Sequence, residues 1–340
     1  MKIYLGIDVG SVTTKLAALD EKDNLLNSIY IRTQGKPILM VQEGLQYIQN
    51  SLPSGSEIAG VGTTGSARYL AGVVVGADIV KNEITTHAVA ALHYVPDVQT
   101  IIEIGGQDSK MILVRDGIVT DFGMNTVCAA GTGSFLDHQA LRLNITVEEF
   151  GPRAMQSKMP VRIAGRCTVF AESDMIHKQQ VGHRTEDILY GLCEALVRNY
   201  LNNVGLGKEI RPPIVFQGGV AFNKAIVKAF EENLKQKVMV PPRHEVMGAI
   251  GAALLVHEEF AGGKKTRFLG FEASQREYRT SSFECKSCPN LCEIAQLGVN
   301  GKILARWGGR CDLWERVASQ AISGKQPELP NVEKEGCHKG

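Results

Sequence analysis

Short apolar runs separated by polar turns open the chain, and they predict antiparallel strands. IYLGIDVG, TTKLAALD and NLLNSIYIRT lie within residues 3–33, and apolar runs of this length joined by tight turns form hairpins. PILMVQEGLQYIQNSL (37–52) has apolar residues at helical spacing and starts with proline, which suits a first helical turn. SEIAGVGTTG (56–65) predicts a further strand that ends in a glycine loop, and NEITTHAVAALHYV (82–95) predicts a helix.

The same pattern then restarts. TIIEIGGQDSKMILVRDGIVTDFG (100–123) again reads as strand, tight turn, strand, turn and strand. Three residue types recur at matching offsets, with acid and lysine seven positions apart both times: Asp8, Gly10 and Lys15, then Glu103, Gly105 and Lys110. The shared offsets indicate an internal duplication.

The rest of the chain completes an α/β fold of two similar lobes. We expect helices near 130–143 and 184–204, a strand in PPIVFQGG, and helices at 221–233 and in EVMGAIGAALLVHEEF. The predicted lobes span 1–95 and 96–260, the second carrying the cysteine-bearing helices. AGGKKTR then reads as a linker into a small cysteine-rich module at 261–320, where LGVNGKILARWGG has an Asn-Gly hairpin signal. The last residues, 321–340, lack apolar periodicity and predict a tail.

Charge and composition narrow the function classes. The chain has 37 basic and 36 acidic residues, so no broad electrostatic surface for nucleic acid or anionic lipid is expected. No leader pattern opens the sequence and no apolar run reaches the length of a membrane span, so we expect a cytoplasmic protein. Eight cysteines in that compartment indicate metal or redox chemistry rather than disulfides.

Three glycine turns carry candidate phosphate-binding groups. Turns of this kind expose backbone N–H groups to phosphate oxygens, and a nearby carboxylate can hold Mg²⁺ through water. Any one of them alone is more often only a turn, but three in this order favour nucleotide binding. The candidates are Asp8, Gly10, Ser11, Thr13, Thr14 and Lys15 in the first turn, Glu103, Gly105, Gly106, Gln107 and Asp108 in the second, and Gly218 and Gly219 in the third.

Two cysteines precede expected helix starts, Cys128 in CAAGTGSFLDH and Cys167 in AGRCTVFAESD. A helix N-terminus favours anionic ligands and lowers the pKa of a thiol placed there. An anionic iron–sulfur cluster suits such a site, but a 4Fe-4S cluster needs four thiolates. A symmetric dimer would supply two from each chain. The alternative for Cys128 alone is a small residue in a tight turn, and Cys193 reads as a buried structural thiol.

The order of the three glycine turns resembles the actin, sugar-kinase and heat-shock-chaperone superfamily of two-lobed ATPases, over residues 1–260. This resemblance implies ATP and Mg²⁺ between two ribonuclease-H-like lobes. It implies that Asp8, with Glu103 or Asp108, organises Mg²⁺ and water. It further implies that Ser11, Thr13, Thr14 and Lys15 face phosphates, and that Gly218 and Gly219 lie near the ribose and base.

A narrower resemblance rests on CAAGTGSFLD, RCTVFAESDMI and IGGQDSK. These are similar to the activator (component A) of 2-hydroxyacyl-CoA dehydratases and to the ATPase subunits of benzoyl-CoA reductase. The resemblance implies a homodimer with one 4Fe-4S cluster held by Cys128 and Cys167 of both chains. It also implies ATP-driven transfer of an electron to a partner protein. Ser134 departs from the arginine expected in that family, which puts a partner or phosphate contact in doubt.

The chain is longer than simple activators. FECKSCPNLCEI and GGRCDLW place Cys285, Cys288, Cys292 and Cys311 in one short segment, enough ligands for a closed tetrahedral site. Zn²⁺ and a second iron–sulfur cluster both fit this spacing. Extended activators resemble the reductases of double-cubane-cluster proteins, which implies a docking or electron-entry module. Cys337 and His338 are taken as incidental.

The leading hypothesis is an ATP-dependent electron donor that a ferredoxin or flavodoxin reduces and that passes electrons to an iron–sulfur partner protein. Gln107 and Asp108, with Glu103, are the candidates for positioning the attacking water. One alternative is a sugar-type small-molecule kinase, which would not need Cys128 and Cys167. The other is a redox regulator that uses the cluster as a switch.

Overall fold

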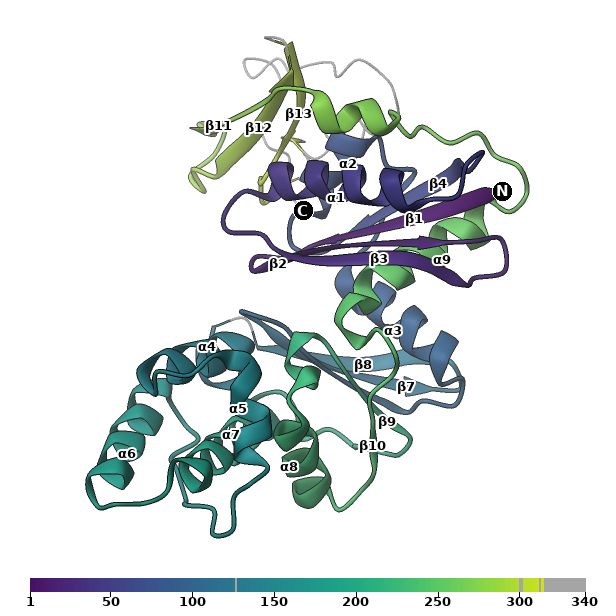
Figure 1. Ribbon diagram of the computed structural model, residues 1–340. Helices are drawn as coiled ribbons and strands as arrows, with labels where there is room; N and C mark the ends of the chain where they lie inside the picture. The colour runs from purple at the N-terminus through teal and green to yellow at the C-terminus, as the bar shows by residue number, and fades with distance from the viewer. Residues whose placement is uncertain (126, 300–301, 312, 315–340) are drawn as a thin grey trace. The chain divides into compact units, whose positions relative to one another are not determined.

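The computed structural model describes residues 1–125, 127–299, 302–311 and 313–314. The described residues form two compact units, one made of residues 1–86 together with the described residues from 248 to 314, and one of those within 87–247 (Figure 1). This division differs from the predicted boundaries at 95 and 260, because the helix of residues 247–260 packs on the first sheet. The predicted tail at 321–340, with Cys337 and His338, lies outside the described residues.

The first unit is built on a five-stranded mixed sheet in the order β3-β2-β1-β4-β5. Neighbours from β3 to β1 are antiparallel, as predicted for the opening meander, whereas β1–β4 and β4–β5 are parallel. The strands are β1 (Lys2–Val9), β2 (Thr13–Leu19), β3 (Leu25–Arg32), β4 (Glu57–Thr64) and β5 (Ile79–Val80).

Helices cover both faces of this sheet. α1 (Pro37–Ser51) and α2 (Arg68–Val75) pack against alternate residues of β1 such as Leu5 and Ile7 (Figure 1). The intervening β1 residues, Tyr4 and Gly6, face α9 (Met247–Phe260). Because side chains alternate between the two faces of a strand, β1 is buried on both sides. α3 (Glu83–Tyr94) runs from this unit into the next.

The second unit repeats the topology of the first. Its sheet has the order β10-β9-β6-β7-β8. The neighbours β6–β7 and β7–β8 are antiparallel, whereas β6–β9 and β9–β10 are parallel. The equivalent strand sequence in both sheets supports the duplication inferred from the acid, glycine and lysine offsets. The strands are β6 (Thr100–Ile104), β7 (Ser109–Arg115), β8 (Ile118–Asn125), β9 (Ile214–Gln217) and β10 (Val238–Met239).

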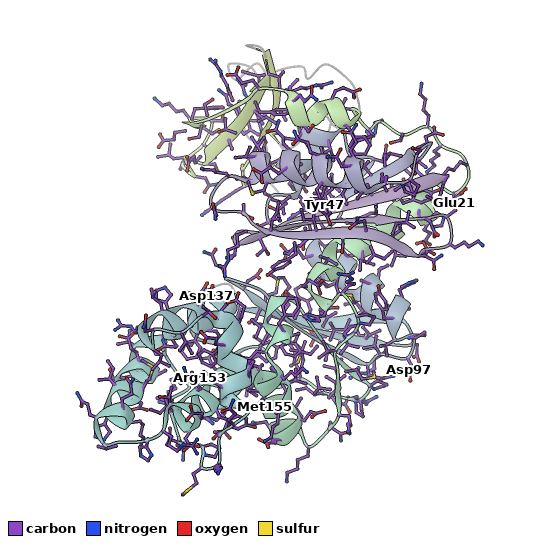
Figure 2. All side chains as sticks on the ribbon, viewed as in Figure 1. Glu21, Tyr47, Asp97, Asp137, Arg153 and Met155 are labelled. Carbon is purple, nitrogen blue, oxygen red and sulfur yellow. The ribbon has the colours of Figure 1, made fainter. Side chains whose placement is uncertain are left out.

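A large helical layer belongs to the second unit, and its central helix is α7 (Thr185–Asn203). The helix α5 (Val147–Ala154) was not predicted, although Thr146 and Glu149 form a reciprocal capping box at its start. Figure 2 labels Asp137 on α4, with Arg153 and Met155 at the end of α5. The other helices are η1 (Ala129–Gly131), α4 (Gly133–Arg142), α5 (Val147–Ala154), α6 (Thr168–Gln180), η2 (Gly219–Phe222), α8 (Lys224–Leu234) and η3 (His244–Val246).

The cysteine-rich segment forms a three-stranded antiparallel sheet that packs on the first unit. After η4 (Phe271–Gln275), the strands β11 (Tyr278–Glu284), β12 (Glu293–Val299) and β13 (Lys302–Trp307) pair in sequence order. The β12–β13 pairing confirms the predicted hairpin. Leu297 and Ala305 join the apolar core of α1 and α2.

The predicted linker is tied to the first sheet through a buried carboxylate. Asp78 accepts hydrogen bonds from Thr266 Oγ1 at 2.7 Å and from Arg267 N at 2.8 Å, and also from Val61 N of β4 at 2.8 Å. The end of the linker is therefore fixed to the first unit. Over the described part of the chain, no helix combines the length and apolar character needed to cross a membrane.

We expect Gly6→Ala to lower the free energy of unfolding of the first unit by about 1–3 kcal/mol, the usual cost of overpacking. A Cβ at Gly6 would lie 1.8 Å from Ala249 O and 2.7 Å from Ala253 N, both backbone atoms of α9. Urea unfolding monitored by far-UV circular dichroism measures the change. Gly262→Ala is the control, since a Cβ there meets nothing within 4 Å. Equal stability of both variants would contradict the prediction.

Candidate functional site

The duplicated acid and lysine face each other across both hairpins. In the first, Asp8 is the cross-strand partner of Lys15, and Lys15 Nζ lies 3.1 Å from Asp8 Oδ2. In the second, Glu103 is paired with Lys110, and Lys110 Nζ lies 3.1 Å from Glu103 Oε2 and 2.8 Å from Asp108 Oδ2. The repeated motif thus builds an equivalent ion pair in each unit.

The glycine turns beside these pairs also match. Gly10 N–H donates to Thr13 O at 2.9 Å, and Gly105 N–H donates to Asp108 O at 3.0 Å. The same three-residue span closes each turn. Two turns of one design, one in each unit, therefore follow the strands that carry Asp8 and Glu103.

Side chains of the first turn divide into exposed and buried hydroxyls. Ser11 is exposed, whereas Thr13 and Thr14 are buried. Thr14 Oγ1 lies 3.0 Å from Thr33 Oγ1, which in turn donates to Gly10 O at 3.1 Å. Thr14 therefore supports the backbone of the turn from inside the unit.

Gly65 allows a second loop to approach Asp8. Its φ is +95°, and a Cβ there would lie 2.4 Å from Val9 O and 2.6 Å from Asp8 Oδ1. The sequence marked this position as a glycine loop but gave it no role. Its signal was a glycine directly after a predicted buried strand.

The second turn is bonded to the start of α4. Gly133 N–H donates to Gly105 O and Ser134 N–H donates to Gly106 O, both at 2.8 Å. The Ser134 hydroxyl donates to the same Gly106 carbonyl at 2.6 Å. Gln107 is exposed at the tip of the turn. Ser134, flagged in the sequence as a departure, is thus part of the contact between turn and helix.

The third glycine turn lies beside the second. Gly218 has φ +94°, and a Cβ there would lie 2.4 Å from Ile104 O and 3.0 Å from Glu103 Oε1. His244 holds the turn from the other side, because Gly218 N–H donates to His244 O at 2.9 Å. Gly219 follows as the first residue of η2. The structure therefore brings Glu103, Gly105, Gly106, Asp108 and Gly218 together within the second unit.

Sequence reasoning missed an aromatic group at this turn. Phe222 is exposed, and its ring contacts the His244 ring edge to face with centroids 4.4 Å apart. A phenylalanine three residues after the double glycine Gly218-Gly219 was the available signal. The exposed Phe222 ring offers an apolar surface near Gly218.

The two candidate cluster cysteines of the second unit lie at the starts of different elements. Cys167 is the N-cap residue of α6, as predicted. Cys128 instead precedes the 3₁₀ turn η1, and α4 begins five residues later. Both thiols are partly exposed, and both η1 and α6 contact α7. Cys193 is fully buried, and burial raises the pKa of its thiol.

Exposed apolar side chains adjoin both cysteines. Val127 is 95% exposed next to Cys128, and Val169 and Phe170 are 67% and 64% exposed in the first turn of α6. Apolar residues grouped at a surface mark contact sites more often than scattered ones do. These residues form the apolar rim of the cysteine site.

The C-terminal cysteines come from the end of β11 and from the segments that follow β11 and β13. Cys285 N–H donates to Cys292 O at 2.8 Å, and Trp314 Nε1–H donates to Cys285 Sγ at 3.2 Å. Burial raises the pKa of the Cys285 thiol, but hydrogen bonds from Ser287 and Trp314 outweigh it and leave the pKa below its usual value.

A metal site requires several ligand side chains to lie close together. Among the described residues, no three histidine, cysteine or acidic side chains gather closely enough to hold a metal ion. The binding of a cluster by Cys128 and Cys167 together with a second chain stays a prediction. Cys285, Cys288, Cys292 and Cys311 do not form a closed site in this geometry, and metal binding there stays a prediction.

Known proteins match this chain over the range that holds all three glycine turns and also Cys128 and Cys167. The model of the BadF/BadG/BcrA/BcrD ATPase family matches residues 5–256. The (R)-2-hydroxyglutaryl-CoA dehydratase activating ATPase of Acidaminococcus fermentans is 36% identical over 269 residues, which is 77% of this chain and all of that protein.

Two solved structures share the fold at meaningful sequence identity. Component A of the Acidaminococcus fermentans (R)-2-hydroxyglutaryl-CoA dehydratase superposes with a TM-score of 0.70 at 32% identity, covering 77% of this chain and all of that one. The activator of 2-hydroxyisocaproyl-CoA dehydratase from Clostridium difficile, with bound ADPNP, superposes with a TM-score of 0.68 at 31% identity, covering 76% and 96%.

We expect Lys110→Met to destabilise the second unit by about 3–5 kcal/mol, the usual cost of leaving a buried charge unpaired. Lys110 is 2% exposed, and its removal leaves Glu103 buried beside a second carboxylate. Guanidinium unfolding measures the loss. Lys15→Met is the comparison, because the Lys15 side chain is 15% exposed, against 2% for the Lys110 side chain. A larger loss for Lys15→Met would contradict this account.

Proposed function

Because the chain belongs to the BadF/BadG/BcrA/BcrD ATPase family, we propose that it is an ATP-dependent donor of low-potential electrons to a partner protein. The observation that carries this proposal is the pair of partly exposed cysteines, Cys128 and Cys167, each directly before an element (η1 or α6) that contacts α7. The same unit carries the glycine turn bonded to α4. A kinase needs no such thiol pair.

MgATP is the proposed nucleotide. The hairpin turns at Gly10 and Gly105 would bind its phosphates through backbone N–H groups, and Asp8 would hold Mg²⁺ through water. Gly218 and Gly219, with the exposed ring of Phe222, would lie along the ribose and base. Support comes from the relative solved with ADPNP and from the matching turns in the two units.

Gln107 is the proposed water-positioning residue. Glu103 and Asp108 both contact Lys110 Nζ, which holds them in an ion-pair network. Gln107 is exposed at the tip of the same turn. Its amide oxygen can accept a hydrogen bond from the water, and its amide N–H can donate one to a phosphate oxygen.

A homodimer is the proposed assembly, with Cys128 and Cys167 of each chain as ligands of one 4Fe-4S cluster. When bound, the cluster supplies a one-electron carrier. The chain's own part is to present two thiols on fixed loops and to surround them with apolar side chains. Val127, Val169 and Phe170 support this role, since burying them in a dimer would exclude water from the thiols.

The electron donor is proposed from the family resemblance, and only a dehydratase-type acceptor has support from the relatives. We infer a ferredoxin or flavodoxin as donor. The acceptor is an iron–sulfur protein of the dehydratase or double-cubane-cluster type, supported by relatives that activate (R)-2-hydroxyglutaryl-CoA and 2-hydroxyisocaproyl-CoA dehydratases. The C-terminal sheet with Cys285, Cys288, Cys292 and Cys311 is the proposed docking or electron-entry module, with Zn²⁺ or a second cluster as its predicted metal.

We expect Cys128→Ser and Cys167→Ser each to abolish the reduced-cluster signal and to shift the dimer toward monomer. The measurements are EPR of anaerobically purified, dithionite-reduced protein with and without MgATP, and light scattering. Cys288→Ser is the control and should keep the MgATP-sensitive signal. A wild-type protein without iron would overturn the electron-donor proposal and leave the kinase. Unchanged signals in both serine variants would exclude these thiols as ligands.

We expect Gln107→Ala to lower kcat for MgATP hydrolysis about a hundredfold with little change in KM, because a water-positioning group acts in the transition state. Steady-state phosphate release measures both constants. Gln180→Ala, an exposed glutamine at the end of α6, is the control. An unchanged kcat for Gln107→Ala would reassign the role within the turn.

A further inference from the structure

One buried asparagine forms hydrogen bonds with the backbone of Cys128. Asn125, the last residue of β8, is 8% exposed. Its Oδ1 accepts a hydrogen bond from Cys128 N at 2.9 Å, and its Nδ2 donates to Cys128 O at 2.7 Å. Both backbone polar groups of Cys128 are therefore fixed by a single side chain.

A second buried asparagine holds the loop of the other cysteine. Asn199 of α7 is 3% exposed, and its Nδ2 donates to Gly165 O at 2.7 Å and to Arg166 O at 3.3 Å. These two carbonyls directly precede Cys167. Asn199 Oδ1 accepts from Asn203 Nδ2 at 2.9 Å, so the amide is oriented with its donor toward the cysteine loop.

The two asparagines meet at Gly131, the last residue of η1. A Cβ at Gly131 would lie 2.8 Å from Asn199 Oδ1 and 3.5 Å from Asn125 Nδ2. The turn that follows Cys128 therefore rests on the same side chain that holds the backbone before Cys167. Glycine is required there because any side chain would displace one of the amides.

We propose that Asn125 and Asn199 are positioning residues that fix Cys128 and Cys167 relative to each other, so that one chain presents its two thiols at a set separation. The proposal rests on the proposed function, in which these thiols bind a cluster. Neither side chain is hydrogen-bonded to a thiol, and each acts through the backbone. A buried amide network whose bonds are satisfied specifies one arrangement of the groups it joins.

An uncharged amide side chain also suits positions 125 and 199. A carboxylate at either position would add negative charge beside an anionic cluster, and it would face carbonyl oxygens without a hydrogen to share. A lysine or arginine would need room that the buried site between η1 and α7 does not offer. Asparagine donates and accepts at once and stays neutral.

The test is Asn199→Asp, which keeps the shape of the side chain and replaces the donor with an oxygen opposite two carbonyls. We expect iron loss to a ferrous chelator to speed up by about 10–100-fold, the range for groups that orient ligands. The g values of the reduced EPR spectrum should also change, which simple loss of stability would not cause. Asn233→Asp is the control for loss of an amide donor away from the cysteine loops, since the Nδ2 of exposed Asn233 donates to Ala229 O at 2.8 Å on α8.

A milder variant keeps the test decisive if Asn199→Asp fails to fold by circular dichroism. Asn125→Asp keeps the acceptor for Cys128 N–H and replaces only the donor to Cys128 O. Unchanged g values and unchanged iron loss in the folded asparagine variants would overturn the positioning role while the wild type still holds its cluster. A wild type without iron would instead overturn the proposed function, so the two failures are distinguishable.

Discussion

The hydrogen bonds between the start of α4 and the second glycine turn hold the functional parts of the second unit together. The first N–H groups of a helix have no partner within it, and here Gly133 and Ser134 give theirs to Gly105 O and Gly106 O. The turn carbonyls thus point at the helix. Since Cys128 lies just before η1 and α4, the candidate phosphate turn and the cysteine loop are joined through a few continuous residues.

This contact would give the proposed nucleotide a physical route to the proposed cluster thiols. A ligand changes a conformational equilibrium only by binding one state better than another. Any change in the turn that alters the direction of the Gly105 or Gly106 carbonyls must either move the first turn of α4 or break bonds of 2.6–2.8 Å. Ser134 strengthens the contact, because its hydroxyl and its N–H both reach Gly106 O.

The parts of the fold with a local signal could be predicted from sequence. Alternating apolar runs predicted both meanders, the repeated acid and lysine offsets predicted the duplication, and the Asn-Gly dipeptide predicted the β12–β13 hairpin. The N-cap position of Cys167 was likewise predictable. α5 was missed because its apolar pattern is too short to show helical periodicity. Its capping box at Thr146 and Glu149 is a local signal that could have predicted it.

Contacts between distant residues could not be predicted in this way. The packing of α9 on β1 depends on Gly6 meeting Ala249, and nothing local in either segment specifies the other. The hydrogen bond between the Thr14 hydroxyl and Thr33, which directly follows β3, could not be predicted from either segment. Asn199 reads as an ordinary polar residue in a helix until Gly165 and Arg166 are seen beside it.

The first unit is discontinuous in sequence, and the second is a single uninterrupted stretch inserted into it. On the ribosome, the strands of the first sheet therefore emerge long before α9, whose backbone lies against Gly6. One apolar face of that sheet stays uncovered until the whole inserted unit has been synthesised. Because domains fold as units during synthesis, the inserted unit is the first to have all its residues available, and the nascent chain needs protection chiefly at its N-terminal sheet.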